Sequence, residues 1–310
     1  MFNIVEKRHW YFLLSALIII PGLVAMIYSI IAFGSPVKLS IDFTGGTLLE
    51  LSFDQAVQPA DVRQVLAEND FPGSAVTTTA DDTVLIRTKP MEPEAKTGIM
   101  NALEQAFGGV EELRFESVGP AVGAEVTRTA SIAVAVAALF ILAFIIFAFR
   151  KVPNAFRYGV CAIAAMVHDI LVTVGLFSLA GLILGWEADA LFLTALLTVI
   201  GFSVQDTIVV FDRIRENIPK RRGEPYETIV NRSLLETIHR SLATQLNAIF
   251  VLIALLLFGG ATMKQFVAVL LVGLLSGTYS SIFNAVPLLV VWETGKLKGT
   301  RKKAEAKATA

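Results

Sequence analysis

Two aspartates, Asp169 and Asp206, lie inside long apolar runs of the chain, and their type and position point to chemistry. A charged side chain at the centre of a membrane helix costs about 2.5–3.5 kcal/mol on insertion scales, and intramembrane carboxylates commonly serve proton relays, ion sites or substrate paths. Burial disfavours a carboxylate's charged form, whereas a nearby cation favours it. A carboxylate placed between these influences can load and release a proton. The alternative is a structural ion pair or a hydrogen bond between helices.

The elements that must position these aspartates are six apolar runs. A helix rises about 1.5 Å per residue and the hydrocarbon core is about 30 Å thick, so about 20 apolar residues cross it. The chain is 55% hydrophobic, above the 45–50% typical of soluble domains. Asp169 falls in the third predicted span and Asp206 near the cytoplasmic end of the fourth. The predicted spans are 11–33, 129–149, 158–179, 190–211, 242–258 and 266–292.

The distribution of positive charge predicts the orientation. The N-terminus, the 150–157 turn, the 212–240 loop and the tail hold 18 of the 26 lysines and arginines. Cytoplasmic loops of membrane proteins carry this excess, so both termini are predicted to be cytoplasmic. The same rule accounts for the basic charge, which is expected to contact membrane lipid. We therefore predict no nucleic-acid partner.

The resulting organisation has four parts. Segment 1–33 is the N-terminal tail and first span, and segment 34–127 lies on the extracytoplasmic side. Segment 128–292 holds the other five spans, and segment 293–310 is a basic cytoplasmic tail. The 34–127 segment has 15 acidic and six basic residues, which indicates a soluble acidic domain.

The 34–127 segment alternates between strand and helix patterns. Strands are predicted at 47–53, 75–79, 83–88 and 113–118, and helices at 59–68 and 92–107. The order β-α-β-β-α-β is typical of a ferredoxin-like α+β domain. The segment has no nucleophile–base pair and no phosphate-binding loop, so binding or coupling is a better interpretation than catalysis. We therefore predict that the chain is not an enzyme.

The composition argues against a metal or cofactor site. The chain has one cysteine, Cys161, and its three histidines, His9, His168 and His239, lie far apart in sequence. A disulfide needs two cysteines, and zinc sites cluster cysteine and histidine ligands. We predict no metal ion and no cofactor.

The chain resembles the SecF family, the smaller subunits of the SecDF protein-export complex, from about residue 2 to residue 293. The long run at 206–216 is the most specific of the four patterns that carry the resemblance. At Phe202 and Gln205 the chain departs from the family, which more often has tyrosine and asparagine there. The patterns are DFTGG at 42–46, VHD at 167–169, DTIVVFDRIRE at 206–216 and YSSIF at 279–283.

The resemblance implies the fold and the function. It implies an all-α bundle of six transmembrane helices, half of a transporter of the resistance-nodulation-division type, with an inserted ferredoxin-like extracytoplasmic domain. The chain would act with SecD in the bacterial plasma (inner) membrane, using the proton motive force to promote late-stage protein export. The implied partners are SecD, the SecYEG channel, the unfolded polypeptide in transit and, as a further candidate, YajC.

Two other functions remain open at this stage. A proton-driven exporter of small molecules or lipids can have the same fold, although its outer domains are usually larger. A structural scaffold would tolerate neutralisation of both intramembrane aspartates. Sodium is an alternative to protons as the coupling ion.

The resemblance also implies an essential arginine at Arg240, so Asp206, Arg240 and Asp169 are the candidate ion-coupling residues. Arg240, Thr244 and Asn247 step by four and three and share one helix face. That face is polar in an apolar helix, so we expect it to point into the bundle. The polar residues expected to support the site are Gln205, Thr207, Thr244, Asn247 and His168.

Two glycine patterns complete the prediction. Asp42, Gly45 and Gly46 follow the first span and suit either a hinge to the soluble domain or an ordinary turn, since glycine tolerates positive φ. Gly273 and Gly277, four residues apart in the sixth span, are typical of close helix packing.

Overall fold

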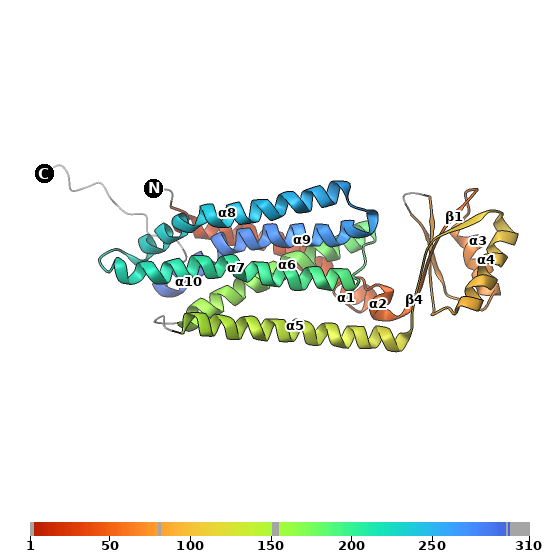
Figure 1. The fold of residues 1–310 in the computed structure, drawn as a ribbon, viewed down its shortest axis with the longest axis horizontal. Helices are drawn as coiled ribbons and strands as arrows, with labels where there is room; N and C mark the ends of the chain where they lie inside the picture. Colours follow the sequence, from red (N-terminus) through yellow and green to blue (C-terminus); the bar gives the residue numbers. More distant parts are fainter. Residues whose placement is uncertain (1–2, 80–81, 151–154, 296, 298–310) are drawn as a thin grey trace. The chain divides into compact units, whose positions relative to one another are not determined.

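The computed structural model describes residues 3–79, 82–150, 155–295 and 297. The chain divides into two compact units (Figure 1). One comprises Met1–Lys38 and Val134–Ala310, and the other is Leu39–Ala133. Part of the predicted 150–157 turn, Asp81 and most of the basic tail lie outside the described residues.

Six helices in the described residues are long and apolar enough to cross a membrane, which confirms the predicted helix bundle. A 3-10 turn at Val5–Lys7 precedes the first of them, and a π-helical segment at Ser281–Ala285 joins the last, α9, to α10 (Val286–Thr294). The six are α1 (Arg8–Phe33), α5 (Pro120–Phe149), α6 (Ala155–Leu184), α7 (Ala190–Lys220), α8 (Tyr226–Phe258) and α9 (Ala261–Ser280), the last continuing through the π-helical segment and α10 as one span.

The helices extend beyond the predicted spans. The 212–240 segment is predicted to be a loop with a separate interfacial helix at 228–237, but the structure continues α7 to Lys220 and includes 228–237 in α8, which begins at Tyr226. The two extensions are joined by ion pairs and hydrogen bonds, including Arg213 Nε to Glu236 Oε2 at 2.6 Å and Asn217 Nδ2 to Ser233 Oγ at 2.9 Å. Polar side chains of this kind stabilise pairs of helices outside the hydrocarbon core. Such helix segments are polar, so hydropathy does not predict them.

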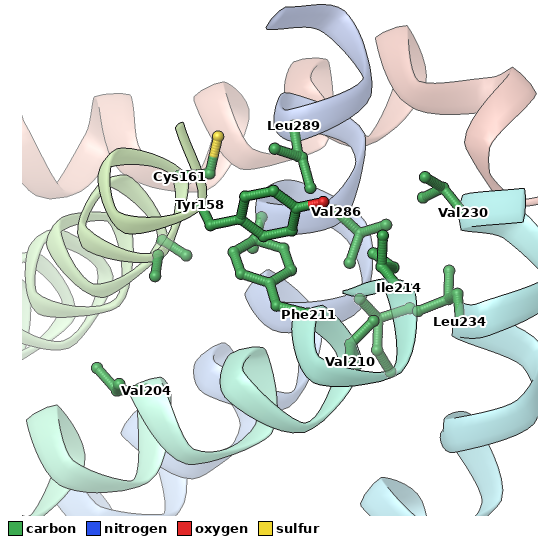
Figure 2. Packing of buried hydrophobic residues seen from close by; sticks show 14 of the residues in the cluster. Tyr158, Cys161, Val204, Val210, Phe211, Ile214, Val230, Leu234, Val286 and Leu289 are labelled. Atoms are coloured by element: carbon green, nitrogen blue, oxygen red, sulfur yellow. The ribbon is translucent and has the colours of Figure 1, made fainter. Parts of the chain in front are cut away.

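The core of the helical unit lies where α6, α7, α8 and α10 meet, with Ile145 and Phe149 added from α5 (Figure 2). The rings of Tyr158 and Phe211 pack edge to face with centroids 5.3 Å apart, and Phe149 stacks on Tyr158 at 5.6 Å. Aromatic pairs of this geometry contribute about 0.5–1.5 kcal/mol beyond area burial. Cys161 is buried in this cluster, consistent with a packing role.

Glycines allow two close helix contacts. At Gly22 of α1, an added Cβ would lie 2.9 Å from Cα of Gly175 in α6, so the backbones touch directly. On α9, a Cβ at Gly273 would overlap the side chain of Val199 in α7, and one at Gly277 would lie 3.3 Å from Cα of Ser203. The packing role predicted for the Gly273 and Gly277 stripe is confirmed, since small residues let membrane helices approach closely.

The second unit contains a four-stranded antiparallel sheet in the order β2-β3-β1-β4. With the connections β-α-β-β-α-β this is the predicted ferredoxin-like arrangement, and α3 and α4 lie on one face (Figure 1). The register places Leu49 opposite Ile86 and Phe115. The elements are β1 (Gly46–Phe53), α3 (Pro59–Glu68), β2 (Ala75–Thr78), β3 (Val84–Thr88), α4 (Pro93–Phe107) and β4 (Val110–Val118).

The core of this sheet unit is formed by apolar side chains of its strands and helices. Leu49 and Leu51 of β1 are fully buried and pack with the helix residues Leu66 and Leu103. Proline occupies the first turn of both helices, where its missing N–H is not needed.

Candidate ion-coupling site

Asp206 is buried in α7, with 4% of its surface exposed. Its Oδ2 accepts a hydrogen bond from Nε2 of Gln245 in α8 at 2.6 Å. No ion pair to Asp206 is found among the described residues. Thr207 is fully buried beside it, and its hydroxyl donates to the backbone oxygen of Ser203. The carboxylate is therefore held by one neutral amide inside the bundle.

Arg240 does not contact Asp206. It is exposed on α8, and so are Thr244 and Asn247, so the expectation that this face points into the bundle is wrong for this chain. The buried face is instead formed by Thr237, Ser241 and Gln245, one helical position away. The Ser241 hydroxyl has no hydrogen-bond partner among the described residues.

Arg240 lies instead at a polar pocket of about 450 Å³ between α7 and α8. Two acids of this pocket pair with Arg213, whose guanidinium contacts Glu236 at 2.6 Å and Glu216 at 2.9 Å. The third acid, Asp212, pairs with Arg215 at 2.6 Å. Arg240 therefore faces outward from this chain beside a compensated cluster of charges.

Gln205 also points away from the bundle interior. It is exposed and lines a groove of about 570 Å³ between α5 and α7, whose other walls include Phe140 and Phe144. The structure does not bring Gln205 to the carboxylate of Asp206, which takes its amide partner from Gln245.

Asp169 is fully buried in α6 and joins three helices. Its Oδ2 accepts from the hydroxyls of Ser203 in α7 at 2.5 Å and Ser280 in α9 at 2.6 Å, and its Oδ1 accepts from Ser276 at 2.7 Å. Nδ1 of His168 lies 3.0 Å from Oδ1. Four polar groups thus surround one buried carboxylate, an arrangement that stabilises negative charge.

His168 belongs to a second set of polar contacts on the α1 side of the same helix. Its ring stacks on Tyr279, with centroids 6.2 Å apart. The Tyr279 hydroxyl donates to the backbone oxygen of Tyr11 at 2.7 Å, and Nδ2 of Asn284 donates to the Ser15 hydroxyl at 2.8 Å. Asn284 lies in the π-helical segment, and such segments often occur at functional sites.

The DFTGG segment forms a packed junction inside the sheet unit. Residues Ile41–Thr44 form the short helix α2, and Gly45 and Gly46 adopt φ of 71° and 126°. A Cβ at Gly45 would lie 2.9 Å from Cα of Pro120, where α5 begins. Asp42 lies in the first turn of α2, capped by the Ser40 hydroxyl. The hinge role of Asp42, Gly45 and Gly46 stays a prediction.

The serines around Asp169 and the amide of Gln245 were not predicted. Ser276 lies four residues before Ser280, and the pair marks one face of α9, a signal visible in the sequence. Gln245 lies four residues after Ser241 and shares its face in the same way.

Six apolar helices, two buried aspartates and an inserted ferredoxin-like domain define a multi-pass membrane protein with ionisable groups inside its bundle. The model of the family described as "Protein export membrane protein SecD/SecF, C-terminal" matches residues 99–295, and that of the "SecD/SecF GG Motif" matches residues 30–57. The chain belongs to the SecD/SecF family of protein-export membrane proteins.

Curated relatives match over the full length. The chain is 48% identical to the protein translocase subunit SecF of Anaerolinea thermophila and 50% identical to that of Thermobaculum terrenum, with 100% of each chain covered. The crystal structure of SecDF, a translocon-associated membrane protein from Thermus thermophilus, matches with a TM-score of 0.78 at 33% identity. The match covers 94% of this chain and 38% of that one. SecDF in a form called super-membrane-facing matches with a TM-score of 0.64.

Proposed function

We propose that this chain is an accessory subunit of the Sec protein translocase that works with SecD and uses the proton motive force to promote late-stage protein export. The observation that carries the proposal is full-length identity of 48–50% to SecF proteins, together with an aspartate buried in the fourth apolar helix. The chain acts by coupling ion movement to motion and not by chemical catalysis.

The SecDF relative supports SecD as the partner. In that protein a single chain contains a part similar to this chain and, in addition, a longer stretch of other sequence. The outward polar face of α7 and α8, which includes Gln205, Arg240, Thr244 and Asn247, would be costly against lipid and fits a contact with SecD. The SecYEG channel, YajC and the polypeptide in transit are proposed as further partners.

The proposed location is the bacterial inner membrane with both termini in the cytoplasm. Segment 34–127 is proposed to be the extracytoplasmic domain, 128–292 the remaining helices and 293–310 the cytoplasmic tail. The positive-inside distribution of lysine and arginine supports this orientation. Asp42, Gly45 and Gly46 are proposed to transmit motion between the first helix and this domain.

Ion coupling is proposed to depend on Asp206, Arg240 and Asp169. Asp206 has no compensating charge among the described residues of this chain, so its charged state is costly until a partner or a proton compensates it. Arg240 faces outward and is available to a partner subunit. A proton crossing 100 mV releases about 2.3 kcal/mol, enough to bias a two-state domain about 50-fold.

The test is Asp206→Asn in vesicles that contain this chain, SecD and the channel. We expect the variant to assemble normally but to lose the stimulation of export by a proton gradient. Asp212→Asn, six residues further along α7 and partly exposed, is the matched control and should keep that stimulation. Normal gradient-dependent export by Asp206→Asn would reject the coupling role, and substitution of sodium for the proton gradient identifies the ion.

A further inference from the structure

Helix α5 belongs to both compact units of the chain. It runs without a break from Pro120 to Phe149, and the boundary between the units falls inside it, after Ala133. Only Gly119 separates it from β4, which ends at Val118. Sharp kinks in helices arise at proline, at glycine–serine pairs or at π-bulges, and α5 has none of these beyond its first residue. A displacement of the sheet unit therefore reaches the membrane part of α5.

A second connection fixes the first turns of α5 to the DFTGG segment, directly beside the end of the strand pair β1 and β4. A Cβ added at Gly123 would lie 2.7 Å from the backbone nitrogen of Gly45 and 3.1 Å from the backbone oxygen of Phe43. One turn later, the Thr127 hydroxyl donates to the same Phe43 oxygen at 3.1 Å. Closely packed contacts have low compressibility and transmit displacement. The DFTGG segment and the start of α5 therefore form one rigid junction.

Beyond that junction, α5 is held by the rest of the chain only near its far end. Of its 30 residues, all of which the structure describes, only Gly123, Ile145 and Phe149 are buried. The Phe149 ring stacks on Tyr158 of α6 and meets the Phe211 ring of α7 edge to face, with centroids 6.2 Å apart. A rigid helix that is fixed at its two ends and open between them can tilt about the aromatic cluster.

The groove of about 570 Å³ between α5 and α7 is the space in which such a tilt would occur. Phe140 and Phe144 line it from α5, and Gly201 and Gln205 line it from α7. A Cβ added at Gly201 would meet no atom within 4 Å, so α7 leaves open space on this side. Because Asp206 directly follows Gln205, a change in the width of the groove acts on the segment of α7 that holds the buried carboxylate.

We propose that α5 is a rigid lever between the sheet unit and α7, with Gly123 and Thr127 as the positioning residues that fix it to the sheet unit. A movement of the sheet unit tilts α5 about the cluster at Phe149 and changes the width of the groove beside Gln205. Because coupling between two sites is reciprocal, a rearrangement of α7 also moves the sheet unit. The use of the lever in export rests on the proposed function, whereas the joint movement of the sheet unit and α5 does not.

The experiment measures distances between pairs of nitroxide labels by double electron–electron resonance, on the full chain with SecD in nanodiscs. Cys161→Ala removes the only native cysteine, so that labels attach only to introduced cysteines. One label is placed at Thr77 of β2, and the other at Val136 of α5 or at Phe250 of α8, all of which are exposed. We expect the sheet-to-α5 distance to have a narrow distribution, and the sheet-to-α8 distance to have one at least about twice as broad. Equal widths would overturn the lever.

The junction is tested with matched glycine variants. Gly123→Ala puts a methyl group against the backbone of Gly45, and we expect it to broaden the sheet-to-α5 distribution at least about twofold. Thr127→Val removes only the hydroxyl bond to Phe43, so it should fold normally and broaden the distribution less. Gly119→Ala meets nothing within 4 Å and is the control that should leave the distribution unchanged. A distribution that neither Gly123→Ala nor Thr127→Val broadens overturns the junction.

An export assay separates the lever from the proposed function. Gly123→Ala should reduce the stimulation of export by a proton gradient at least about threefold, and Gly119→Ala should not. If Gly123→Ala keeps that stimulation while Asp206→Asn loses it, the lever is wrong and the proposed function stands. If Asp206→Asn keeps the stimulation, the coupling role of Asp206 is wrong, whereas the distance measurements still decide whether α5 moves with the sheet unit.

Discussion

At the scale of single residues, the hydrogen bond between Gln245 and Asp206 makes a specific prediction. Gln245→Leu leaves the buried carboxylate without its donor, which should lower the free energy of unfolding by about 1–3 kcal/mol. Thr244→Val, at the adjacent but exposed position, should stay within about 0.5 kcal/mol of the wild type. Denaturation of the purified chain in mild detergent measures both. Equal losses of unfolding free energy in the two variants would mean that the hydrogen bond from Gln245 to Asp206 does not stabilise the fold.

The same residues show what the sequence could predict about the site. The cost of a charge at membrane depth was enough to select Asp169 and Asp206. The partner of Asp206 was not predictable, because α8 carries two polar stripes of similar spacing, one with Ser241 and Gln245 and one with Arg240 and Thr244. Periodicity establishes that residues share a face. Which face points inward depends on how α8 rotates against α7, and on surfaces that a partner subunit covers.

At the scale of helices and strands, the contact between α1 and α6 rests on backbone contact at Gly22 and Gly175. Gly22→Ala puts a methyl group 2.9 Å from Cα of Gly175, so the helices must separate, and we expect a loss of about 1–3 kcal/mol in stability. Gly201→Ala in α7 meets nothing within 4 Å and should be neutral or stabilising by up to about 1 kcal/mol. The thermal unfolding temperatures of the two variants distinguish a glycine that is required for helix packing from one that is not.

The elements themselves were largely predictable, and their ends were not. In the sheet unit, the alternation of strand and helix patterns predicted all six elements of the ferredoxin-like fold. In the helical unit, hydropathy located six spans but ended the fourth at Phe211, whereas α7 continues to Lys220. Hydropathy reports how much of a helix suits hydrocarbon. The hydrogen bonding of the helix continues into the aqueous region, where pairs such as Arg213 and Glu236 support it.

At the scale of the whole molecule, Arg8 makes contacts within the chain, whereas Arg240 is proposed to act between chains. Arg8 is fully buried and pairs with Glu227 at 3.1 Å, which ties the start of α1 to the start of α8. Arg8→Gln should therefore cost about 1–3 kcal/mol in stability, because it removes the hydrogen bonds of the buried guanidinium to Glu227 and to the backbone oxygen of Val5. Arg240→Gln should leave the stability of the isolated chain within about 0.5 kcal/mol.

The matching measurement on the complex is copurification with SecD. We expect Arg240→Gln to reduce recovery of SecD while the chain itself remains folded, and Arg8→Gln to reduce the yield of the chain. If Arg240→Gln binds SecD as well as the wild type does, the exposed face of α8 is not the contact surface.

The attachment of Asp169 to three helices also has a consequence for synthesis. Its hydroxyl donors on α9 are encoded 107 and 111 residues later, so they do not exist when α6 leaves the ribosome. At about 5–20 residues per second, roughly 5–20 s pass before they follow. Ser203 of α7 follows after only 34 residues, and before it His168 is the one member of the cluster already present beside the carboxylate. The neighbouring histidine is thus placed to help α6 enter the bilayer early, before the rest of the bundle has been made.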